Sequence, residues 1–428
     1  MAVLRIGVDD TDSPRGMCTT YVGAVMERRL QGMGLGRLEY SRLIRLNPCC
    51  PFKTRGNAAV SLHFECPEFL VERAVDVVVD TVEELYEKGY GETQPGVVVL
   101  VDGEVPASWR DFALRAVREM VAVEEALELA EDAGALVYRF NGGRGVVGAV
   151  ASIGCPLENP TYEAIAYRAR KNWGTVRRVD IKSVAQLHAA GVSFDSYNPE
   201  TNESRITPHT PCPVLAGVRA LTPENALKGL SMVRFHEEVE LLTVYATNQA
   251  TDMHLTETTI AGMKPFSNAV VEGRIVSKPR ITAGGHVFTE VDDGTGVVTC
   301  AAYRPTGSLR RVVASLRPGD RVRMMGSVKP KPSGLTLNIE KLEVSEVVEY
   351  VVLRPPRCPS CMKRMDSAGR GKGYRCKGCG MRLDDSFGER TVESRVINPG
   401  MYEASVSARR HLSKPLCLQS IFPMTNSQ

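Results

Sequence analysis

Long hydrophobic runs are missing from this sequence of 428 residues. No stretch approaches the roughly eighteen consecutive apolar residues that a membrane-spanning helix needs. The N-terminal segment MAVLRIGVDD reaches acidic side chains too early for the apolar core of a secretory signal. Internal repeats and low-complexity segments are also missing at the usual periods. We therefore expect a cytoplasmic protein that makes no membrane contact.

The composition is that of a globular protein with several domains. Hydrophobic residues make up 43% and charged residues 24% of the chain, which leaves little room for disorder. A chain of this length is too long for one hydrophobic core and long enough for about three or four compact units. Four of the 12 cysteines have the spacing of a metal site and the others are scattered, as is typical of a reducing compartment.

Charge is distributed unevenly along the chain. The net charge is only +3, but residues 351–428 hold 14 Lys plus Arg against 6 Asp plus Glu. This end therefore carries +8 and the remainder −5. A basic end on an acidic body indicates that one region holds a polyanion while chemistry takes place in another. Composition alone does not distinguish nucleic acid from other polyanions.

The first part of the chain predicts an α+β domain over residues 1–135. Residues 2–8 have the pattern of a short buried strand that ends in an acidic loop. A helix follows the loop, and Thr19 or Thr20 is its expected N-cap. Two strands and a series of amphipathic helices complete the order expected of an α+β unit.

Three further units are expected, which makes the fold class multidomain α+β. Residues 136–262 predict a second α+β unit with ferredoxin-like elements, including a helix capped by Thr222 with Pro223 in its first position. Residues 263–350 contain short β segments and turn signals that favour an OB-fold β-barrel, with a plain β-sandwich as the alternative. Residues 351–428 predict a zinc ribbon and a basic C-terminal tail.

The strongest local motif consists of two CxxC pairs that are fourteen residues apart. Its members are Cys358, Cys361, Cys376 and Cys379. Four thiolates on two tight turns can close a tetrahedral shell around Zn²⁺ without an open position for water, which predicts a structural site. The five Lys and Arg residues of the spacer suit contact with a phosphate backbone. Unrelated buried cysteines and redox use of one CxxC pair are the weaker alternatives.

An acidic loop forms the second motif. Asp9, Asp10 and Asp12 lie between a predicted strand and a predicted helix. Three carboxylates this close repel one another unless a cation joins them, and Mg²⁺ with nucleotide phosphates is the usual occupant of such a site. Thr19 and Thr20 lie at the start of the next helix, where free N–H groups favour a phosphate or a phosphothreonine. An acidic turn that only caps the helix is the alternative.

Two loops have side chains suited to phosphate. The first has two cations, a hydroxyl and a glycine that could line a triphosphate, and it could equally be a solvated hairpin. Its residues are Lys53, Thr54, Arg55, Gly56 and Asn57. The glycine-rich segment Asn141–Ala149 could also hold phosphate, although it lacks the Walker arrangement.

A polar cluster follows a predicted strand in the segment ATNQATDMHL. Asn248, Gln249 and Asp252 give this strand end an unusual density of hydrogen-bonding groups. An amine or guanidinium substrate needs a carboxylate, and Asp252 is our candidate. His254, in the same segment, is more often structural than catalytic in such a setting.

Taken in order, these segments resemble archaeal agmatidine synthetases over essentially the whole chain. The resemblance is carried by IGVDDTDSPRGMCTT, RLIRLNPCCPFKTRGNAAV, TNQATDMHL, the OB-like region, the CxxC ribbon and ARRHLSKPL. It implies a threonine-bearing catalytic kinase domain, a ferredoxin-like domain, an OB-fold and a zinc ribbon. It also implies that ATP and Mg²⁺ activate the 2-oxo group of a cytidine by phosphorylation, after which the amine of agmatine displaces it. The implied RNA is the minor isoleucine tRNA, whose CAU anticodon is modified at its wobble cytidine to read AUA.

The resemblance also implies roles for particular residues. The phosphorylated threonine of the family carries over onto Thr19, and its metal-binding loop onto Asp9, Asp10 and Asp12. Agmatine is expected near the ferredoxin-like domain. The adjacent cysteines of PCCP depart from the expected pattern. Two other functions remain open at this point, a non-catalytic single-stranded nucleic-acid-binding protein and a kinase that the nucleic-acid-binding half only scaffolds.

Overall fold

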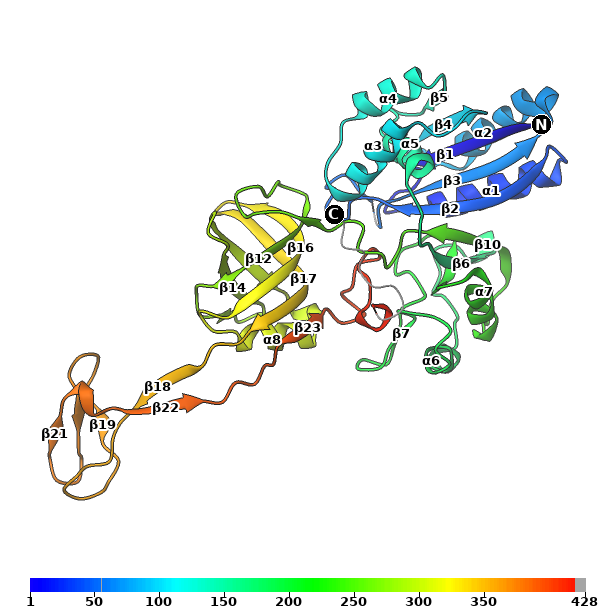
Figure 1. The fold of residues 1–428 in the computed structure, drawn as a ribbon. Helices are drawn as coiled ribbons and strands as arrows, with labels where there is room; N and C mark the ends of the chain where they lie inside the picture. Colours follow the sequence, from blue (N-terminus) through cyan, green and yellow to red (C-terminus); the bar gives the residue numbers. More distant parts are fainter. Residues whose placement is uncertain (55, 420–428) are drawn as a thin grey trace.

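The N-terminal half of the protein is built on one mixed sheet of eight strands (Figure 1). The computed structural model describes residues 1–54 and 56–419. The strands of this sheet are β1 Ala2–Asp9, β2 Arg37–Arg45, β3 Ala58–Cys66, β4 Gly96–Val101, β5 Leu136–Arg139, β6 Thr161–Arg168, β9 Val214–Ala220 and β10 Val239–Thr247. Their order in space is β5-β4-β1-β3-β2-β10-β6-β9.

Helices cover both faces of the first five strands. They are α1 Thr19–Gly32, α2 Val71–Leu85, α3 Ala107–Arg118, α4 Val123–Asp132 and α5 Val146–Gly154. Leu4, Ile6 and Val8 of β1 pack in one core with α1 and α2. Val98 and Leu100 of β4 pack in a second core with α3, α4 and α5. Burial on both faces explains why these strands appear in the sequence as short apolar runs.

The second α+β unit continues the same sheet. Strands β6, β9 and β10 pack against α6 Ile181–Ala189 and α7 Pro223–Met232, and a hairpin of β7 Tyr197–Asn198 and β8 Glu203–Ser204 lies beside them. Thr222 accepts a hydrogen bond from the Asn225 N–H at 3.2 Å, which confirms the predicted cap. Strand β10 pairs in parallel with β2, with Tyr245 opposite Ser41. The two α+β units therefore share one sheet.

The third unit is a small barrel, as predicted. It consists of β11 Thr256–Glu257, β12 Asn268–Ile275, β13 Arg280–Ile281, β14 Val287–Asp292, β15 Val297–Ala302, α8 Ser308–Ser315, β16 Arg321–Lys331 and β17 Gly334–Glu346. Strand β12 pairs with both β16 and β14, which closes the sheet on itself. Closure removes the free edges that an open sheet would expose.

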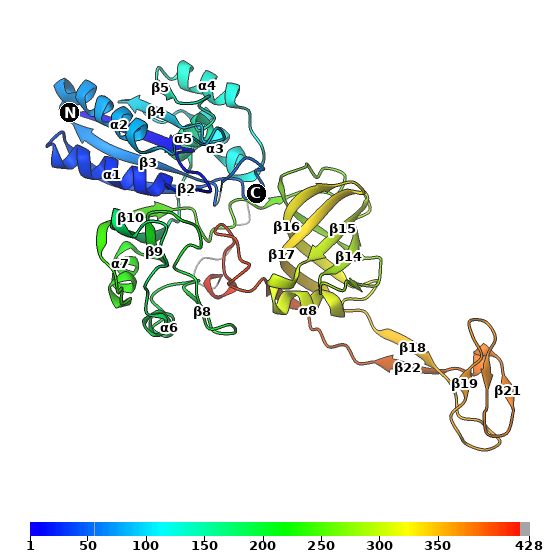
Figure 2. The ribbon, with the colours of Figure 1, turned by 180° about the vertical axis from the view of Figure 1, so that it is seen from behind.

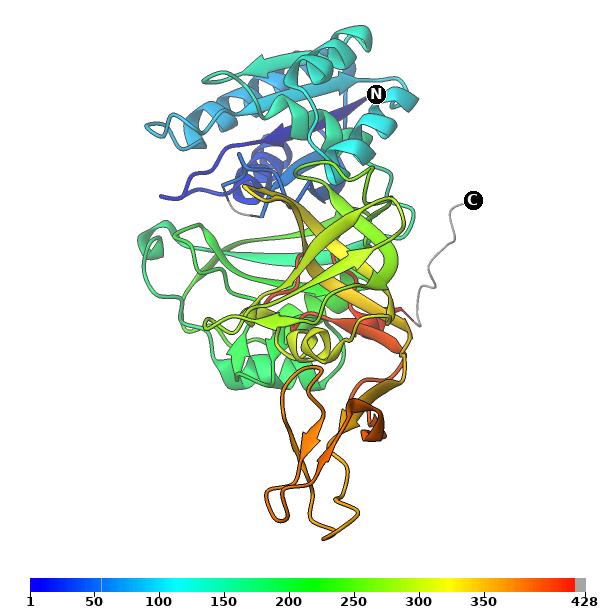
Figure 3. The same ribbon diagram turned by 90° about the vertical axis from the view of Figure 1, so that its left-hand side faces the viewer.

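A two-stranded arm holds the zinc ribbon away from the body (Figures 1 and 2). The arm pairs β18 Tyr350–Arg354 with β22 Glu389–Glu393, and the ribbon consists of β19 Asp366–Ser367, β20 Tyr374–Arg375 and β21 Arg382–Leu383. The chain then returns, and β23 Gly400–Glu403 pairs with β17. Residues 404–419, called the tail below, run between the barrel and the second unit (Figures 2 and 3). No helix in the described part of the chain is long and apolar enough to cross a membrane.

Candidate active site

A cavity of about 420 Å³ lies between the two α+β units and the tail. Most of the predicted phosphate-site residues line it. These are Asp9, Asp10, Asp12, Thr19, Lys53, Thr54, Gly56 and Asn57. The structure thus brings three separate sequence segments to one place. Arg55, the remaining residue of the predicted loop, lies outside the described residues.

The acidic loop begins where β1 ends. Asp10 has a left-handed backbone (φ 60°), and its N–H donates to Oδ1 of Asp9 at 2.7 Å. Arg144, in the glycine-rich segment, donates to Oδ2 of Asp10 at 2.8 Å. Burial and the neighbouring charges of Asp10 and Asp12 hold the pKa of the Asp9 carboxyl well above its usual value. The ionised form of the Asp9 carboxyl group therefore requires a positive charge nearby.

The glycine-rich segment lies very close to the acidic loop. A Cβ at position 148 would lie 1.9 Å from Oδ2 of Asp9, so only Gly148 lets α5 pass the carboxylate. Arg144, Gly145, Val147 and Gly148 all line the cavity. The start of α5 therefore borders the site, close to the acidic loop.

Helix α1 begins at the cavity, but its cap differs from the prediction. Cys18 is the N-cap, with an extended backbone, and Thr19 is the first residue of the helix. The predicted cap at Thr19 or Thr20 is wrong, because both residues already have helical geometry. Thr19 instead accepts a hydrogen bond from the Thr11 hydroxyl at 3.1 Å, which ties it to the acidic loop.

The loop around Lys53 is folded over the strand ends. Lys53 donates to the carbonyl of Pro48, and burial lowers the pKa of its ammonium. Asn57 has φ 46° and donates to the carbonyl of Asn47 at 2.8 Å. A Cβ at Gly56 would lie 2.6 Å from Nη1 of Arg45, so the glycine allows this loop to contact β2. The described residues of this loop are partly buried and line the cavity.

The polar residues after β10 support the cavity from outside its lining. The side chain of Asn248 bonds both backbone groups of Arg45, at 2.8 and 3.0 Å. Gln249 donates from Nε2 to Oε2 of Glu163 at 2.6 Å. Neither Asn248 nor Gln249 is among the lining residues, whereas Arg45 and Glu163 both are.

Asp252, the predicted carboxylate for the amine, contacts other parts of the protein. It forms an ion pair with Lys341 of β17 and accepts a hydrogen bond from the Lys414 N–H at 2.7 Å. The structure thus places Asp252 where the second unit, the barrel and the tail meet, outside the cavity lining. His254 lies close by, fully buried, and bonds Glu340 at 3.1 Å.

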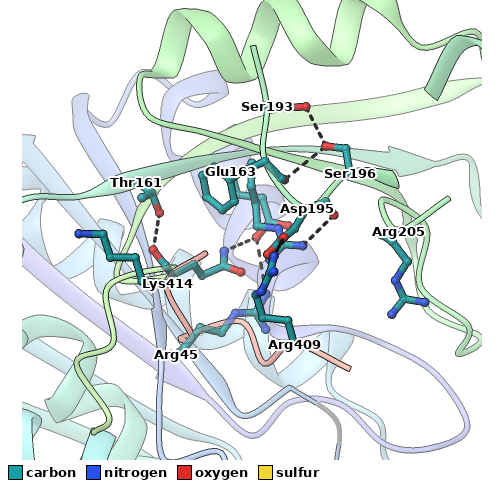
Figure 4. A network of polar contacts seen from close by, with 12 residues as sticks. Arg45, Thr161, Glu163, Ser193, Asp195, Ser196, Arg205, Arg409 and Lys414 are labelled. Carbon is teal, nitrogen blue, oxygen red and sulfur yellow. Dashed lines mark hydrogen bonds and ion pairs between the residues drawn. The ribbon is translucent and has the colours of Figure 1, made fainter. Parts of the chain in front are cut away.

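Glu163, which the sequence interpretation missed, lies in the cavity. It is on β6 and only 7% exposed, and Nη2 of Arg45 lies 3.5 Å from its Oε2 (Figure 4). A Cβ at Gly217 on the neighbouring strand would lie 2.4 Å from Oε1, so the glycine makes room for the carboxylate. A lone Glu among apolar strand residues, in TYEAIAYR, was the available signal.

The tail completes the cavity. His411 lines it, and the positive charge of Arg45 lowers the pKa of its imidazole well below the usual value. Arg409 forms an ion pair with Asp195 (Figure 4) and another with Glu403. The tail is thereby fastened to the second unit. The motif ARRHLSKPL indicated a resemblance, but its contacts are long-range and leave no local pattern.

The ribbon contains the predicted metal site. One ligand atom from each of Cys358, Cys361, Cys376 and Cys379 lies within 4.8 Å of all the others. Among the described residues, this is the one group of His, Cys, Asp and Glu that meets this spacing. The N–H of Cys379 and the thiol of Cys361 lower the pKa of Cys376 to about 6. Four sulfurs at this spacing form a structural zinc site.

A cavity lined in part by acidic, basic and hydroxyl side chains, in an α+β body joined to an OB-fold and a zinc ribbon, is typical of an enzyme with an attached nucleic-acid-binding module. Family models match the chain in the same order: the TiaS TCKD domain at residues 5–142, the TiaS FLD domain at 143–254, an OB-fold nucleic acid binding domain at 269–345 and the TiaS C-terminal zinc ribbon domain at 355–393. The chain belongs to the TiaS family of 2-agmatinylcytidine synthetases, which act on an isoleucine tRNA.

Individual relatives are similar over nearly their whole length. The tRNA 2-agmatinylcytidine synthetase TiaS of Pyrococcus horikoshii is 42% identical, with 97% of each chain covered, and that of Archaeoglobus fulgidus is 40% identical, also with 97% of each covered. A crystal structure of apo TiaS has 38% identity and a TM-score of 0.85, covering 100% of this chain and 99% of that one. A TiaS complex with its isoleucine tRNA, AMPCPP and agmatine has 35% identity and a TM-score of 0.86, covering 100% and 98%.

Proposed function

We propose that this chain uses ATP to ligate agmatine to the C-2 position of the wobble cytidine in the CAU anticodon of the minor isoleucine tRNA, so that the anticodon reads AUA. The observation that carries the proposal is the 42% identity to the P. horikoshii 2-agmatinylcytidine synthetase over 97% of both chains. The cavity in the body, with its acidic and basic lining residues, and the basic ribbon outside it fit an enzyme that holds a large polyanion while it acts on one base.

The reaction explains why a nucleotide is needed. The 2-oxo oxygen of cytosine is a very poor leaving group for an attacking amine. Transfer of a phosphoryl group from ATP to this oxygen makes it a good one. The amine nitrogen of agmatine then bonds to C-2, the C–O bond breaks, the phosphate leaves and the nitrogen loses a proton. Phosphoryl transfer of this kind depends on positioning and on charge stabilisation.

The first unit supplies most of the groups for the phosphates. Helix α1 points its N-terminus toward the cavity at Thr19, where N–H groups and the helix dipole favour an anion. Lys53 and Arg144 add positive charge to the same lining. Thr19 is the residue we expect to accept a phosphoryl group. The loop from Lys53 to Asn57 then borders the nucleotide.

The acidic loop suits a divalent cation. Asp9 is buried beside two other carboxylates, and burial together with the charges of Asp10 and Asp12 raises its pKa. Asp9, Asp10 and Asp12 would hold a cation that prefers oxygen ligands, such as Mg²⁺. This cation would neutralise charge on the nucleotide phosphates. Arg144 already contacts Asp10 and holds this carboxylate beside α5.

The second unit supplies a carboxylate for the amine substrate. Glu163 lines the cavity, whereas Asp252 is engaged by Lys341 and the tail. We therefore assign the cationic amine to the side of the cavity that contains Glu163. Gln249 is hydrogen-bonded to Glu163, and Asn248 is hydrogen-bonded to the backbone of Arg45. These two residues of the predicted polar cluster therefore position residues that line the cavity.

The proposal is tested by incorporation of labelled agmatine into tRNA transcripts. The chain should label the transcript with a CAU anticodon only when ATP and a divalent cation are present. A matched transcript with uridine in place of the wobble cytidine should stay unlabelled. Tight tRNA binding without labelling would contradict the proposal and indicate a single-stranded nucleic-acid-binding protein.

A further inference from the structure

The connection between β8 and β9 contains a loop, residues 207–213, that has space on both sides. Four residues of the loop, from Thr207 to Thr210, line the main cavity and also border a second cavity of about 490 Å³. Residues 174–177 form the far side of this second cavity. Because cavities lie in front of and behind the loop, packing alone does little to fix its position.

The loop also has few backbone hydrogen bonds of its own. Pro208, Pro211 and Pro213 have no N–H to donate. Within the loop, the Cys212 N–H donates to the Thr210 carbonyl at 2.8 Å. The loop forms no helix or strand, so its carbonyls need partners from elsewhere.

The side chain of Arg177 supplies partners for three of these carbonyls, while the backbone N–H of Arg168 donates to the Pro213 carbonyl at 2.9 Å. Its Nε donates to the Val214 carbonyl at 2.7 Å and its Nη1 to the Pro208 carbonyl at 2.8 Å. Its Nη2 donates to the carbonyls of Thr210 and Cys212 at 2.8 and 3.0 Å. One planar guanidinium therefore bonds four carbonyls along the loop and the start of β9.

We propose that Arg177 is a positioning residue that sets the shape of the cavity on the side where the amine substrate binds. The inference rests on the proposed function. Of the cavity-lining residues that come from the second unit, Glu163 is the one carboxylate, and it is on β6. Strand β9, which the loop leads into, pairs directly with β6, with Arg219 opposite Glu163.

This arrangement separates the two substrates. The groups assigned to ATP lie on the acidic loop, on α1, on the Lys53 loop and at Arg144. None of them contacts Arg177 in the described part of the chain. Loss of Arg177 should therefore affect binding of agmatine far more than binding of ATP.

The chemistry of arginine also predicts which substitutions fail. Lysine offers a point charge with three donors, whereas the contacts at Arg177 need donors spread over a planar fork. Arg177→Lys should thus behave like Arg177→Ala, although it keeps the charge. Arg178 provides a matched control, because it is the exposed neighbour and its hydrogen bonds are made by its backbone: the N–H donates to Glu237 at 2.8 Å, and the carbonyl accepts from the His236 N–H at 2.8 Å.

The experiment measures KM for agmatine and for ATP with the full-length chain and tRNA. Arg177→Ala and Arg177→Lys should raise KM for agmatine by about tenfold or more and leave KM for ATP within about twofold, with Arg178→Ala unchanged. Thermal unfolding of each variant shows that it is folded. An unchanged KM for agmatine in the folded Arg177→Ala protein, or an equal rise in both constants, would overturn the inference.

A failure of the proposed function would look different, because the wild-type chain itself would incorporate no agmatine. Hydrogen exchange then tests the positioning role without turnover. The amides of residues 205–216 should exchange faster in Arg177→Ala than in Arg178→Ala. Equal exchange in the two variants would refute the role of Arg177.

Discussion

Gln249 donates a hydrogen bond from Nε2 to Oε2 of Glu163 at 2.6 Å, and both side chains are nearly excluded from solvent. Arg45 lies 3.5 Å from the same oxygen. The three residues come from the end of β10, from β6 and from the end of β2, the strands through which the two units share their sheet. The joint between the units therefore also holds the one carboxylate that the second unit contributes to the cavity.

Replacement of Gln249 by alanine should lower the stability of the protein and also impair binding of agmatine. Glu163 would lose a buried donor, which costs about 1–3 kcal/mol of folding free energy. We expect lower stability in urea unfolding and a higher KM for agmatine. Gln31→Ala, at an exposed position of α1, should change stability by less than about 0.5 kcal/mol. Equal stability of the two variants would show that the bond contributes nothing.

Thr19→Ala should abolish modification while leaving affinity for tRNA nearly unchanged. The hydroxyl lies at the start of α1 in the cavity, whereas we expect the basic ribbon and the barrel to make most of the contacts with the RNA. Thr19→Ser retains a hydroxyl and should retain activity. Turnover and filter binding measured on the same preparations check both statements. A large loss of tRNA affinity with residual turnover in Thr19→Ala would contradict the assigned role.

Cys376→Ser should release the metal and weaken tRNA binding. A serine hydroxyl stays protonated and binds zinc poorly, so the four-sulfur shell cannot close. Cys417→Ser, at an exposed cysteine outside the ribbon, is the matched control and should keep one zinc per chain. Elemental analysis measures the zinc content of each variant. Full zinc occupancy in Cys376→Ser would refute the four-cysteine site.

Asp252→Asn should destabilise the protein without impairing recognition of agmatine. Lys341 is only 1% exposed and would keep a buried charge without its partner, which costs about 3–5 kcal/mol. Lys341→Met in the same protein should recover part of this loss. The readouts are urea unfolding and KM for agmatine. A large rise in KM in a fully stable Asp252→Asn protein would instead support Asp252 as the substrate carboxylate.

The local elements of this fold could be predicted from the sequence because each has its own signal. The apolar run of β1, the cap at Thr222, the turns of the barrel and the CxxC spacing all depend on neighbouring residues. The acidic loop and the Lys53 loop were predicted separately, and the structure brings them to the same cavity.

The remaining features depend on contacts between distant segments. The parallel pairing of β2 with β10 makes one sheet of two predicted units, and no periodicity signals it. Glu163 belongs to the site because Gly217 on the next strand leaves it room. Arg177 is recognisable only once the carbonyls of the loop surround it. Asp252 had the right chemistry for an amine, but Lys341 and the tail engage it.

The most direct test of the account is mass spectrometry of the anticodon fragment from isoleucine tRNA with a CAU anticodon. The tRNA is incubated with the protein, ATP, Mg²⁺ and agmatine, and with each component left out in turn. The account predicts that the wobble cytidine gains the mass of agmatine less one water, only in the complete mixture. An unmodified cytidine in the complete mixture, with the tRNA still tightly bound, would contradict it.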